Sequence, residues 1–250
     1  SGDGAVIDGC HIQATTGSTH GIQIYPGSGA KNVTIRNSRI ETRFSGKAAI
    51  YVETFALLDG FTLEESEVIG DYGVTQSFGA LDTTIRGNTF EGIDGSTKRA
   101  IQLKTPITNV VIENNEISGF AVGIRLDSNS NDLGSGPVAI RKNNIHGNAD
   151  EQLMIKRASG VIIEENVISG DLLEAIGIHV YGTYSDLDVK EIVGNQILDG
   201  ETGILVEESA AAGNSAHCND IVGNAVGVEN QDPVDNFDAE NNWWGDPSGP

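Results

Sequence analysis

One short pattern recurs along the whole chain: an aliphatic residue, two variable residues, an asparagine, one further residue and a second aliphatic residue. It is clearest in VIIEENVISG, residues 161–170, where Asn166 stands between Ile163 and Ile168. The asparagine slot is filled by Asn88, Asn115, Asn143, Asn166, Asn195, Asn219 and Asn241, and upstream by Cys10, Ser38 and Ser66. Successive slots lie 22 to 29 residues apart. A repeat of this length is typical of a solenoid built from stacked coils.

Each repeat continues into a second apolar segment that alternates with a period of two. Examples are AIQL at 100–103, GIRL at 123–126 and GIHV at 177–180. Such alternation predicts β-strands with one buried face. The sequence shows neither helical periodicity nor the leucine spacing of leucine-rich repeats. We therefore predict an all-β fold, a single-stranded parallel β-helix of about ten coils over residues 1–250.

The recurrent asparagine then has a structural role. We expect each side chain to point inward at a corner, to bond the equivalent residue one coil away, and to adopt the left-handed backbone conformation that asparagine tolerates. Serine and cysteine are the small substitutes in the first coils, so the prediction is an Asn/Ser corner ladder. Cys10 and Cys218 would stand about 38 Å apart at about 4.8 Å per coil, which predicts two free thiols.

These repeats resemble those of right-handed parallel β-helix proteins of the pectate-lyase-like superfamily, and the resemblance covers essentially the whole chain. The segment NNWWGDPSGP, residues 241–250, is similar to segments that close or follow such helices in extracellular microbial proteins. The resemblance implies an extracellular or cell-surface location, with residues 1–250 as one domain of a longer secreted or surface protein. It is weakly specific for function, because the superfamily includes polysaccharide lyases, uronate epimerases, glycoside hydrolases, tailspikes and non-catalytic surface proteins.

The formal net charge is −21, from 36 acidic and 15 basic residues. A chain this acidic repels nucleic acid and anionic membrane surfaces, so we expect no nucleic-acid partner. The sequence contains no apolar run of about 18 residues, and we expect no membrane insertion. Acid enrichment also favours a halophilic setting, where salt screens the repulsion between carboxylates. An ordinary acidic extracellular protein is the alternative.

A parallel stack places equivalent residues of successive coils beside one another. One predicted outward column runs through Gln23, Tyr51, Thr75, Gln102, Arg125, Met154, His179, Leu205 and Glu229, and a neighbouring column contains Tyr25, Glu53, Lys104, Asp127, Lys156, Tyr181 and Glu207. Four basic residues of these columns fall on consecutive coils: Lys104, Arg125, Lys156 and His179. In a chain with so few basic residues, this clustering predicts a groove for an acidic polysaccharide or cell-surface glycan.

The groove has a catalytic and a non-catalytic interpretation. Uronate lyases and epimerases remove a proton next to a carboxylate, which needs a cation and a base. The candidate catalytic residues are Arg125 as the carboxylate clamp, Lys104, Lys156 or His179 as the base, and Tyr181 as the acid; Tyr51, Gln102, Asp127 and Arg157 are the candidate substrate-binding residues. The Asp-Pro-His motif of uronate epimerases is missing from the sequence. The alternative is a structural rod, such as an adhesin stalk, a surface-layer module or a tail-fibre module.

One segment offers candidate ligands for calcium. Oxygen-bearing side chains alternate in DSNSND, and the candidate metal ligands are Asp127, Asn129, Asn131 and Asp132. Ca²⁺ is bound by oxygen ligands at such spacings in calcium loops. The segment lacks the glycine and the distal glutamate of an EF-hand, so a solvated polar turn is the alternative. Calcium is the candidate cofactor.

Overall fold

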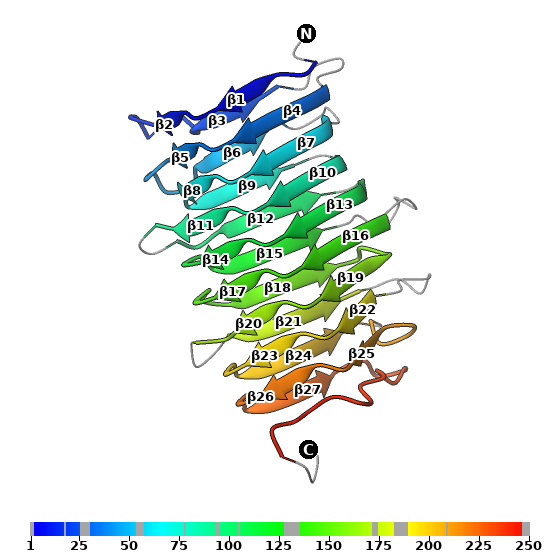
Figure 1. The fold of residues 1–250 in the computed structure, drawn as a ribbon. Coiled ribbons are helices and arrows are strands. Elements are labelled where there is room, and N and C mark those ends of the chain that lie inside the picture. Colours follow the sequence, from blue (N-terminus) through cyan, green and yellow to red (C-terminus); the bar gives the residue numbers. More distant parts are fainter. Residues whose placement is uncertain are drawn as a thin grey trace.

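In a computed structural model, the chain forms a rod of stacked β-coils (Figure 1). The structure describes residues 3–17, 19–25, 31–53, 58–77, 79–93, 96–104, 106–127, 136–171, 175–182, 190–208 and 210–246. Within these residues it contains no helix that is long and apolar enough to span a membrane.

Three parallel sheets run along the rod. The first sheet consists of β1 (Val6–Asp8), β4 (Lys31–Arg36), β7 (Leu58–Glu64), β10 (Ala80–Arg86), β13 (Ile107–Glu113), β16 (Gly136–Arg141), β19 (Val161–Glu164), β22 (Lys190–Val193) and β25 (Ser215–His217). The second sheet consists of β2 (His11–Gln13), β5 (Arg39–Glu41), β8 (Glu67–Gly70), β11 (Thr89–Gly92), β14 (Glu116–Ser118), β17 (Asn144–His146), β20 (Val167–Ser169), β23 (Gln196–Leu198) and β26 (Asp220–Val222). The third sheet consists of β3 (Ile22–Ile24), β6 (Ala48–Val52), β9 (Tyr72–Gln76), β12 (Arg99–Lys104), β15 (Val122–Asp127), β18 (Glu151–Lys156), β21 (Ile176–Tyr181), β24 (Thr202–Glu207) and β27 (Val226–Asn230).

Each coil contributes one strand to each sheet, which confirms the predicted parallel β-helix. The described residues form nine strands in each sheet, where the repeat predicts about ten coils. The difference lies in the last unit. There the chain makes isolated bridges, Ser215 to Asp238 and Asp220 to Trp243, in place of full strands.

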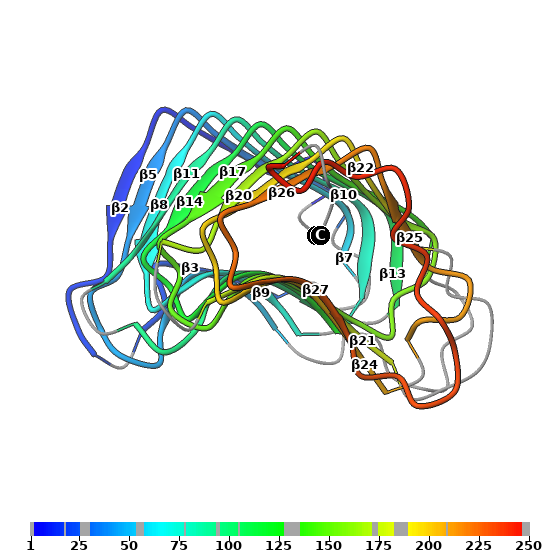
Figure 2. The same ribbon diagram turned by 90° about the horizontal axis from the view of Figure 1, so that it is seen from below.

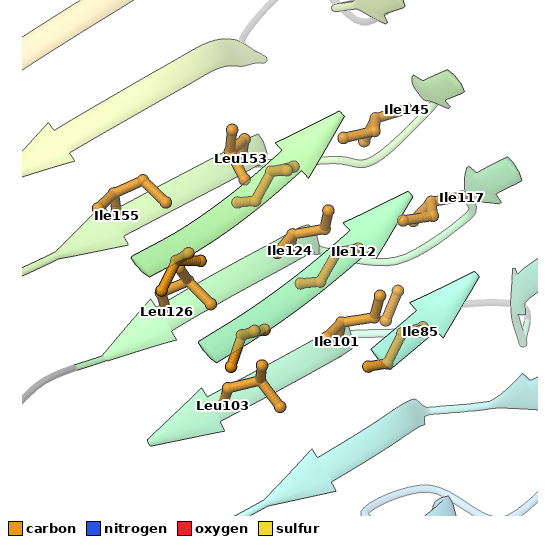
Figure 3. Packing of buried hydrophobic residues seen from close by; sticks show 14 of the residues in the cluster. Ile85, Ile101, Leu103, Ile112, Ile117, Ile124, Leu126, Ile145, Leu153 and Ile155 are labelled. Carbon is orange, nitrogen blue, oxygen red and sulfur yellow. The ribbon is translucent and has the colours of Figure 1, made fainter. Parts of the chain in front are cut away.

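The core fills the space between the three sheets, which surround it when the rod is seen along its axis (Figure 2). Aliphatic side chains stack in register from coil to coil, and Figure 3 shows several of these columns. On the first sheet the column contains Ile85, Ile112, Ile140, Ile163 and Ile192, and on the third sheet it contains Ile101, Ile124, Leu153, Ile178 and Ile204. Burial of one such side chain stabilises the fold by about 1.5–3 kcal/mol.

The corner between the first and second sheets carries the predicted ladder. Asn143 is typical: its backbone N–H and its Nδ2 both donate to Oδ1 of Asn166 on the next coil, at 3.0 and 2.9 Å. The same Nδ2 also donates to the carbonyl of Ile112 on the preceding coil, at 3.0 Å. In the first coils a serine hydroxyl takes the acceptor role, because the backbone N–H of Ser38 donates to Ser66 Oγ. The prediction of an Asn/Ser corner ladder is confirmed.

Two details of the predicted ladder are wrong. The left-handed backbone conformation falls one residue before the slot, on residues such as Asn114, Lys142 and Glu165, each with φ of 55°. The chain turns there so that the next side chain points inward. The last slot is Asn242, whose Oδ1 accepts from Asn219 at 2.9 Å, whereas Asn241 has a φ of 59° and makes the turn.

The two cysteines and the tryptophan pair lie near the ends of the rod. Cys10 and Cys218 are both free thiols, as their separation predicts. Trp244 packs against the core at the C-terminal end, whereas Trp243 is 46% exposed. Trp244 therefore shields the last coil from water.

Candidate functional site

The strands of the third sheet bring the candidate residues together. The outward column pairs in the predicted register: Gln23, Tyr51, Thr75, Gln102, Arg125, Met154, His179, Leu205 and Glu229. The neighbouring column pairs Lys104, Asp127, Lys156, Tyr181 and Glu207. We call the outer surface of β12, β15, β18, β21 and β24 the third-sheet face, and Figure 1 shows these strands stacked one above the other.

The outward column is less exposed than the sequence predicts. Gln102, Met154, His179 and Leu205 have exposed fractions of 6%, 8%, 7% and 8%. The predicted outward column would expose His179 to solvent, and this part of the prediction is wrong, because its side chain is buried. Coils stack only about 4.8 Å apart, so the long side chains of one coil cover the column residues of the next.

The third-sheet face carries more cations than carboxylates on its first three strands. Strands β12, β15 and β18 contain the cations Arg99, Lys104, Arg125 and Lys156 and the carboxylates Asp127 and Glu151. The whole chain, in contrast, has 36 acidic and 15 basic residues. This part of the surface therefore departs from the charge of the rest of the protein.

Arg125 and Asp127 form an ion pair within β15. Arg125 Nη2 donates to Asp127 Oδ2 at 3.0 Å, and the two side chains are 17% and 21% exposed. Asp127 also lies between two lysines of the neighbouring strands, since it pairs in register with Lys104 on one side and Lys156 on the other. The structure thus places Lys104, Arg125, Asp127 and Lys156 in one cluster, as the sequence predicts.

Arg99 belongs to the same cluster, although sequence reasoning missed it. It is the first residue of β12, and the charges of Arg125, Asp127 and Glu151 all act on it. Burial, followed by the charge of Arg125, lowers the pKa of the Arg99 guanidinium below its usual value. The sequence signal that could have found Arg99 is a cation at the start of a predicted strand, three residues before Gln102 of the outward column.

His179 lies between two carboxylates that come from the strands on either side. Its Nδ1 is 2.6 Å from Glu151 Oε1 on β18, and its Nε2 is 2.9 Å from Glu207 Oε2 on β24. Burial alone lowers the pKa of His179, but the hydrogen bonds and charges of Glu151 and Glu207 outweigh it and raise the pKa above 6.5. The histidine therefore ties three coils together.

Tyr181 lies beside this bridge at the end of β21. Its ring meets the His179 ring edge to face, with the centroids 5.8 Å apart, and Lys156 Nζ lies 4.8 Å from the Tyr181 centroid. A hydrogen bond to Glu208, together with desolvation, raises the pKa of the Tyr181 hydroxyl. Arg157 follows Lys156 at the turn after β18, with φ of 55°. An ammonium over an aromatic ring is a stabilising contact, so Lys156 and Tyr181 form a joint platform.

Tyr51 stands apart from the cation cluster. It is on β6, two strands before β12, and its ring stacks on His20 with the centroids 4.4 Å apart and the planes 10° apart. Gln102 lies between Thr75 and Arg125 in the column. Of the candidate substrate-binding residues, Gln102, Asp127 and Arg157 therefore lie at or next to the cluster, and Tyr51 lies at its margin.

The candidate calcium loop is described only at its first residue. Asp127 bonds Arg125, and Asn129, Asn131 and Asp132 lie outside the described residues. Among the residues that the structure describes, no group of three or more His, Cys, Asp or Glu side chains is arranged to hold a metal ion. Calcium binding stays a prediction.

Comparison with known proteins defines the class to which this rod belongs. A family model described as "Right handed beta helix region" matches residues 1–138. The crystal structure of a periplasmic alginate epimerase, AlgG, is similar with a TM-score of 0.64 and 15% identity, over 94% of this chain and 57% of that chain. The A-module of the Azotobacter vinelandii mannuronan C-5 epimerase AlgE4 is similar with a TM-score of 0.60 and 16% identity, over 87% of this chain and 61% of that chain. The chain belongs to the family of right-handed β-helix proteins, and it shares the fold of these two epimerases.

A second family model, described as "Periplasmic copper-binding protein (NosD)", matches residues 84–249. This match covers more than half of the chain, which therefore belongs to the NosD family. A comparison with curated proteins finds no match. The chain spans less than two thirds of the length of the two epimerase structures, and identities near 15% establish a shared fold alone.

Proposed function

We propose that this protein binds an acidic polysaccharide along the third-sheet face. The observation that carries the proposal is the local reversal of charge: β12, β15 and β18 present four cations and two carboxylates on a chain of net charge −21. A polyanion approaching this protein is repelled by most of its surface and attracted by this one. The neighbouring epimerase structures, which are named for alginate and mannuronan, support a carbohydrate as the partner.

Individual side chains on the face suit a sugar chain. Arg125 and Lys104 offer charged donors for carboxylates, and Gln102, which pairs with Arg125 in register, offers an amide. Tyr181, with the Lys156 ammonium over its ring, offers an aromatic group and a cation side by side. These groups repeat from coil to coil about every 4.8 Å, a spacing that lets an extended polymer contact several strands at once. The partner is therefore a polymer rather than a single sugar.

Binding is better supported than proton abstraction. Both ring nitrogens of His179 bond carboxylates, those of Glu151 and Glu207, which also raise its pKa, so neither nitrogen is a free base. The pKa of the Tyr181 hydroxyl is raised, which disfavours the ionised form that could act as a base. Lyase or epimerase activity would therefore depend on Lys104 or Lys156 as the base.

The copper named by the family description does not fit the described residues. Copper sites in proteins use imidazole, thiolate and thioether ligands. Every histidine, cysteine and methionine of this chain is described, and they do not form a set: Cys10 and Cys218 lie in the first and last coils, and both nitrogens of His179 bond carboxylates. Met154 pairs with His179 in the column, Cys10 precedes His11 and Cys218 follows His217. Among the described residues, however, no group of three or more His, Cys, Asp or Glu side chains is arranged to hold a metal ion. We derive no function through copper.

A structural rod is the second candidate. The observation that favours it is the pairing of charges on the face itself, with Arg125 bonded to Asp127 and His179 bonded to two glutamates. Such pairs form charge ladders that hold neighbouring coils together. We also infer a location outside the cytoplasm, since the family description and the AlgG structure both carry the word periplasmic.

Binding of alginate and of a neutral glucan to the purified protein at low salt, measured by titration calorimetry, tests the proposal. We expect alginate to bind, the neutral glucan not to bind, and added salt to weaken binding. Arg125→Ala should weaken binding, whereas Arg86→Ala, which removes a 52%-exposed cation on the first sheet, should not. Absorbance of an unsaturated product in the near ultraviolet would add a lyase activity. If neither polymer binds, the structural rod is the better account.

A further inference from the structure

The outer surface of the first sheet carries charges that alternate in sign from coil to coil. One position of each strand, from β1 to β19, holds a carboxylate and a guanidinium in turn. The members pair in register in the order Asp8, Arg36, Glu64, Arg86, Glu113, Arg141 and Glu164. We call these residues the charge column. The alternation ends at β22 and β25, where the same position holds Val193 and His217.

Each arginine of the charge column forms an ion pair with the carboxylate of the preceding coil. The pairs are Arg36 with Asp8 at 2.8 Å, Arg86 with Glu64 at 2.5 Å, and Arg141 with Glu113 at 2.8 Å. The three arginine side chains are nevertheless between 41% and 52% exposed. A guanidinium has five N–H donors, so each of these arginines retains donors that a second molecule can reach.

A second column without charges runs beside the charge column, two residues earlier in each strand. From β4 to β19 this uncharged column contains Thr34, Thr62, Thr84, Val111, Ala139 and Ile162. None of these side chains is fully buried, and Ile162 is 39% exposed. They are short or apolar, so a second sheet can approach this surface to about 10 Å, the usual distance between packed sheets. The two columns thus form a flat strip that can pack against another sheet.

The first sheet carries little of the negative charge of the chain. From β1 to β19 its strands contain four basic and six acidic residues, whereas the whole chain has a net charge of −21. Two copies of so acidic a chain repel each other over most of their surface. Contact through the first sheet adds little to this repulsion, and salt at about 0.15 M screens charges that are more than about 8 Å apart. The first sheet is therefore a surface on which a second copy can be accepted.

We propose that two copies of this chain associate face to face through the first sheet, with their rods antiparallel. The two-fold axis runs parallel to the strands and passes between β10 and β13. It sets the charge column of one copy against the charge column of the other in reverse order. The facing pairs between copies are Arg86 with Glu113, Glu64 with Arg141, and Arg36 with Glu164. Each pair joins opposite charges, and the symmetry makes each pair twice.

The alternation of charge selects this arrangement over the others. A parallel dimer sets each coil against the same coil of the other copy, so like charges meet along the whole column. An antiparallel dimer whose axis passes through a strand, in place of between two strands, also joins like charges. Unfavourable alternatives of this kind give an interface its specificity. The sequence of signs in the charge column therefore specifies both the antiparallel direction and the register.

The size of the strip predicts a weak dimer. Six strands about 4.8 Å apart and about 20 Å long bury about 1,200 Å² over both copies, near the lower limit for a specific interface. The association should therefore depend on protein concentration. The first and third sheets form different sides of the rod (Figure 2), so the dimer leaves the third-sheet face of each copy open. The inference is independent of the proposed polysaccharide binding.

Analytical ultracentrifugation of the purified protein in potassium chloride of about 0.15 M, over a series of protein concentrations, tests the dimer. We expect the parent to pass from monomer to dimer as the concentration rises. Thr84→Arg places a long charged side chain in the uncharged column and should abolish association. Ser118→Arg adds the same side chain to β14 of the second sheet and should leave association unchanged. A parent that stays monomeric up to about 1 mM, or a dimer that Thr84→Arg leaves intact, would overturn the proposal.

An exchange of charges separates the interface from the stacking of coils. Arg86→Glu alone sets two carboxylates against each other between copies, so it should weaken association by about tenfold or more. Arg86→Glu combined with Glu113→Arg restores opposite charges between copies. Within one copy, however, the exchange places like charges side by side on β7 and β10 and on β13 and β16. The double variant should therefore associate like the parent, although its melting temperature falls. Association as weak as that of Arg86→Glu alone would overturn the proposed register.

Disulfide trapping tests the antiparallel direction. In a background of Cys10→Ser and Cys218→Ser, Thr34→Cys of one copy faces Ile162→Cys of the other. A mixture of these two variants should form a crosslinked heterodimer under mild oxidation. Each variant alone should stay uncrosslinked, since equivalent positions of the two copies lie five coils, or about 24 Å, apart and a disulfide needs Cα atoms within about 7 Å. Crosslinking of Thr34→Cys with itself would indicate a parallel dimer and would overturn the proposal.

Discussion

Polar side chains are stacked coil upon coil in two regions of this protein, the corner ladder and the third-sheet face. At the corner, the same amide makes the same bonds in every coil from Asn88 to Asn219, and each side chain is buried. On the face, neighbouring positions of one column carry an amide, a guanidinium, a thioether and an imidazole. The first region repeats its chemistry, and the second varies it.

This difference separates polar groups that hold the coils together from polar groups that serve another role. A ladder of identical amides satisfies backbone groups that the corner would leave unpaired, and any coil can use it. On the face, the groups differ from coil to coil: His179 bonds the carboxylates of two neighbouring coils, whereas Arg125 bonds Asp127 of its own strand. Under the proposed function, the varied face and not the uniform ladder is the surface that recognises a partner.

The largest expected effect comes from breaking the ladder. Asn166→Leu removes the acceptor of the Asn143 backbone N–H and the donor to the carbonyl of Ile140. At about 1–3 kcal/mol for each buried group left without a partner, we expect a loss of about 3 kcal/mol or more in the free energy of unfolding. Urea denaturation followed by circular dichroism measures it.

Asn144→Leu is the control for this prediction. Asn144 follows the slot residue Asn143, and its amide bonds Glu116 on the outer surface of the second sheet. Its replacement should cost about 1 kcal/mol or less, because water can replace that contact. Equal losses for the two variants would contradict the separate role of the ladder.

A smaller effect is expected where the face contributes to stacking. His179→Gln removes the cation between Glu151 and Glu207, and the two carboxylates are left with a neutral partner. We expect a loss of about 2 kcal/mol at low pH, the cost of breaking a partly buried charged pair. Thermal melts of the parent and the variant measure it.

The pH dependence of this loss follows from the raised pKa of His179. A raised folded-state pKa means that the folded protein holds the proton more tightly than the unfolded chain does. The stabilisation is therefore fully present below the ordinary pKa of 6.5 and is lost as the pH rises through the folded-state pKa. The difference in melting temperature between parent and variant should shrink from pH 5.5 to higher pH. A difference that stays constant, or grows with pH, would contradict the bridge.

The repeat made the register of both regions predictable. Asparagines in a fixed slot and strands with a period of two determine which residues stack, and the pairing of Lys104, Asp127, Lys156 and Tyr181 follows from that alone. The register does not determine which side chain of a neighbouring coil bonds a given residue of the column. Glu151 and Glu207 each lie 28 residues from His179 in the sequence. Their side-chain conformations bring both carboxylates onto the imidazole, and the register alone does not determine these conformations. The sequence therefore predicts the positions of the candidate site and not its pairing.

Salt should distinguish the charged surface from the corner ladder, because it screens charges and leaves hydrogen bonds between amides unchanged. Raising potassium chloride to molar concentrations screens the repulsion among the carboxylates of a chain with net charge −21, so the melting temperature of the parent should rise. The increase should be smaller than the decrease caused by Asn166→Leu. The loss caused by Asn166→Leu should itself be independent of salt, since the ladder contains no charges. A flat or falling salt series would contradict the halophilic interpretation.

The smallest expected effect extends the ladder by one coil. Ser66 occupies a slot, and its hydroxyl oxygen accepts from the backbone N–H of Ser38. The Ser66 hydroxyl itself donates to the backbone carbonyl of Glu64 in the same coil, and not to a carbonyl of the preceding coil. In the next coil, Asn88 Nδ2 reaches back to the carbonyl of Leu63 at 3.0 Å. Ser66→Asn would give the third coil an equivalent bond to the carbonyl of Ile35.

One net hydrogen bond contributes about 0.5–1.5 kcal/mol, and fixing a longer side chain offsets part of it, so we expect a gain of about 0.5 kcal/mol for Ser66→Asn. Urea denaturation of the parent and the variant should show a small rise in midpoint with an unchanged slope. Ser38→Asn, one coil nearer the N-terminal end of the rod, should give a smaller gain. The carbonyl that this amide would reach belongs to Ile7, which is only partly buried, whereas Ile35 is fully buried. A loss of stability in both variants would show that the first coils are too narrow for the amide. The serines there would then be a requirement of packing and not a weaker version of the same ladder.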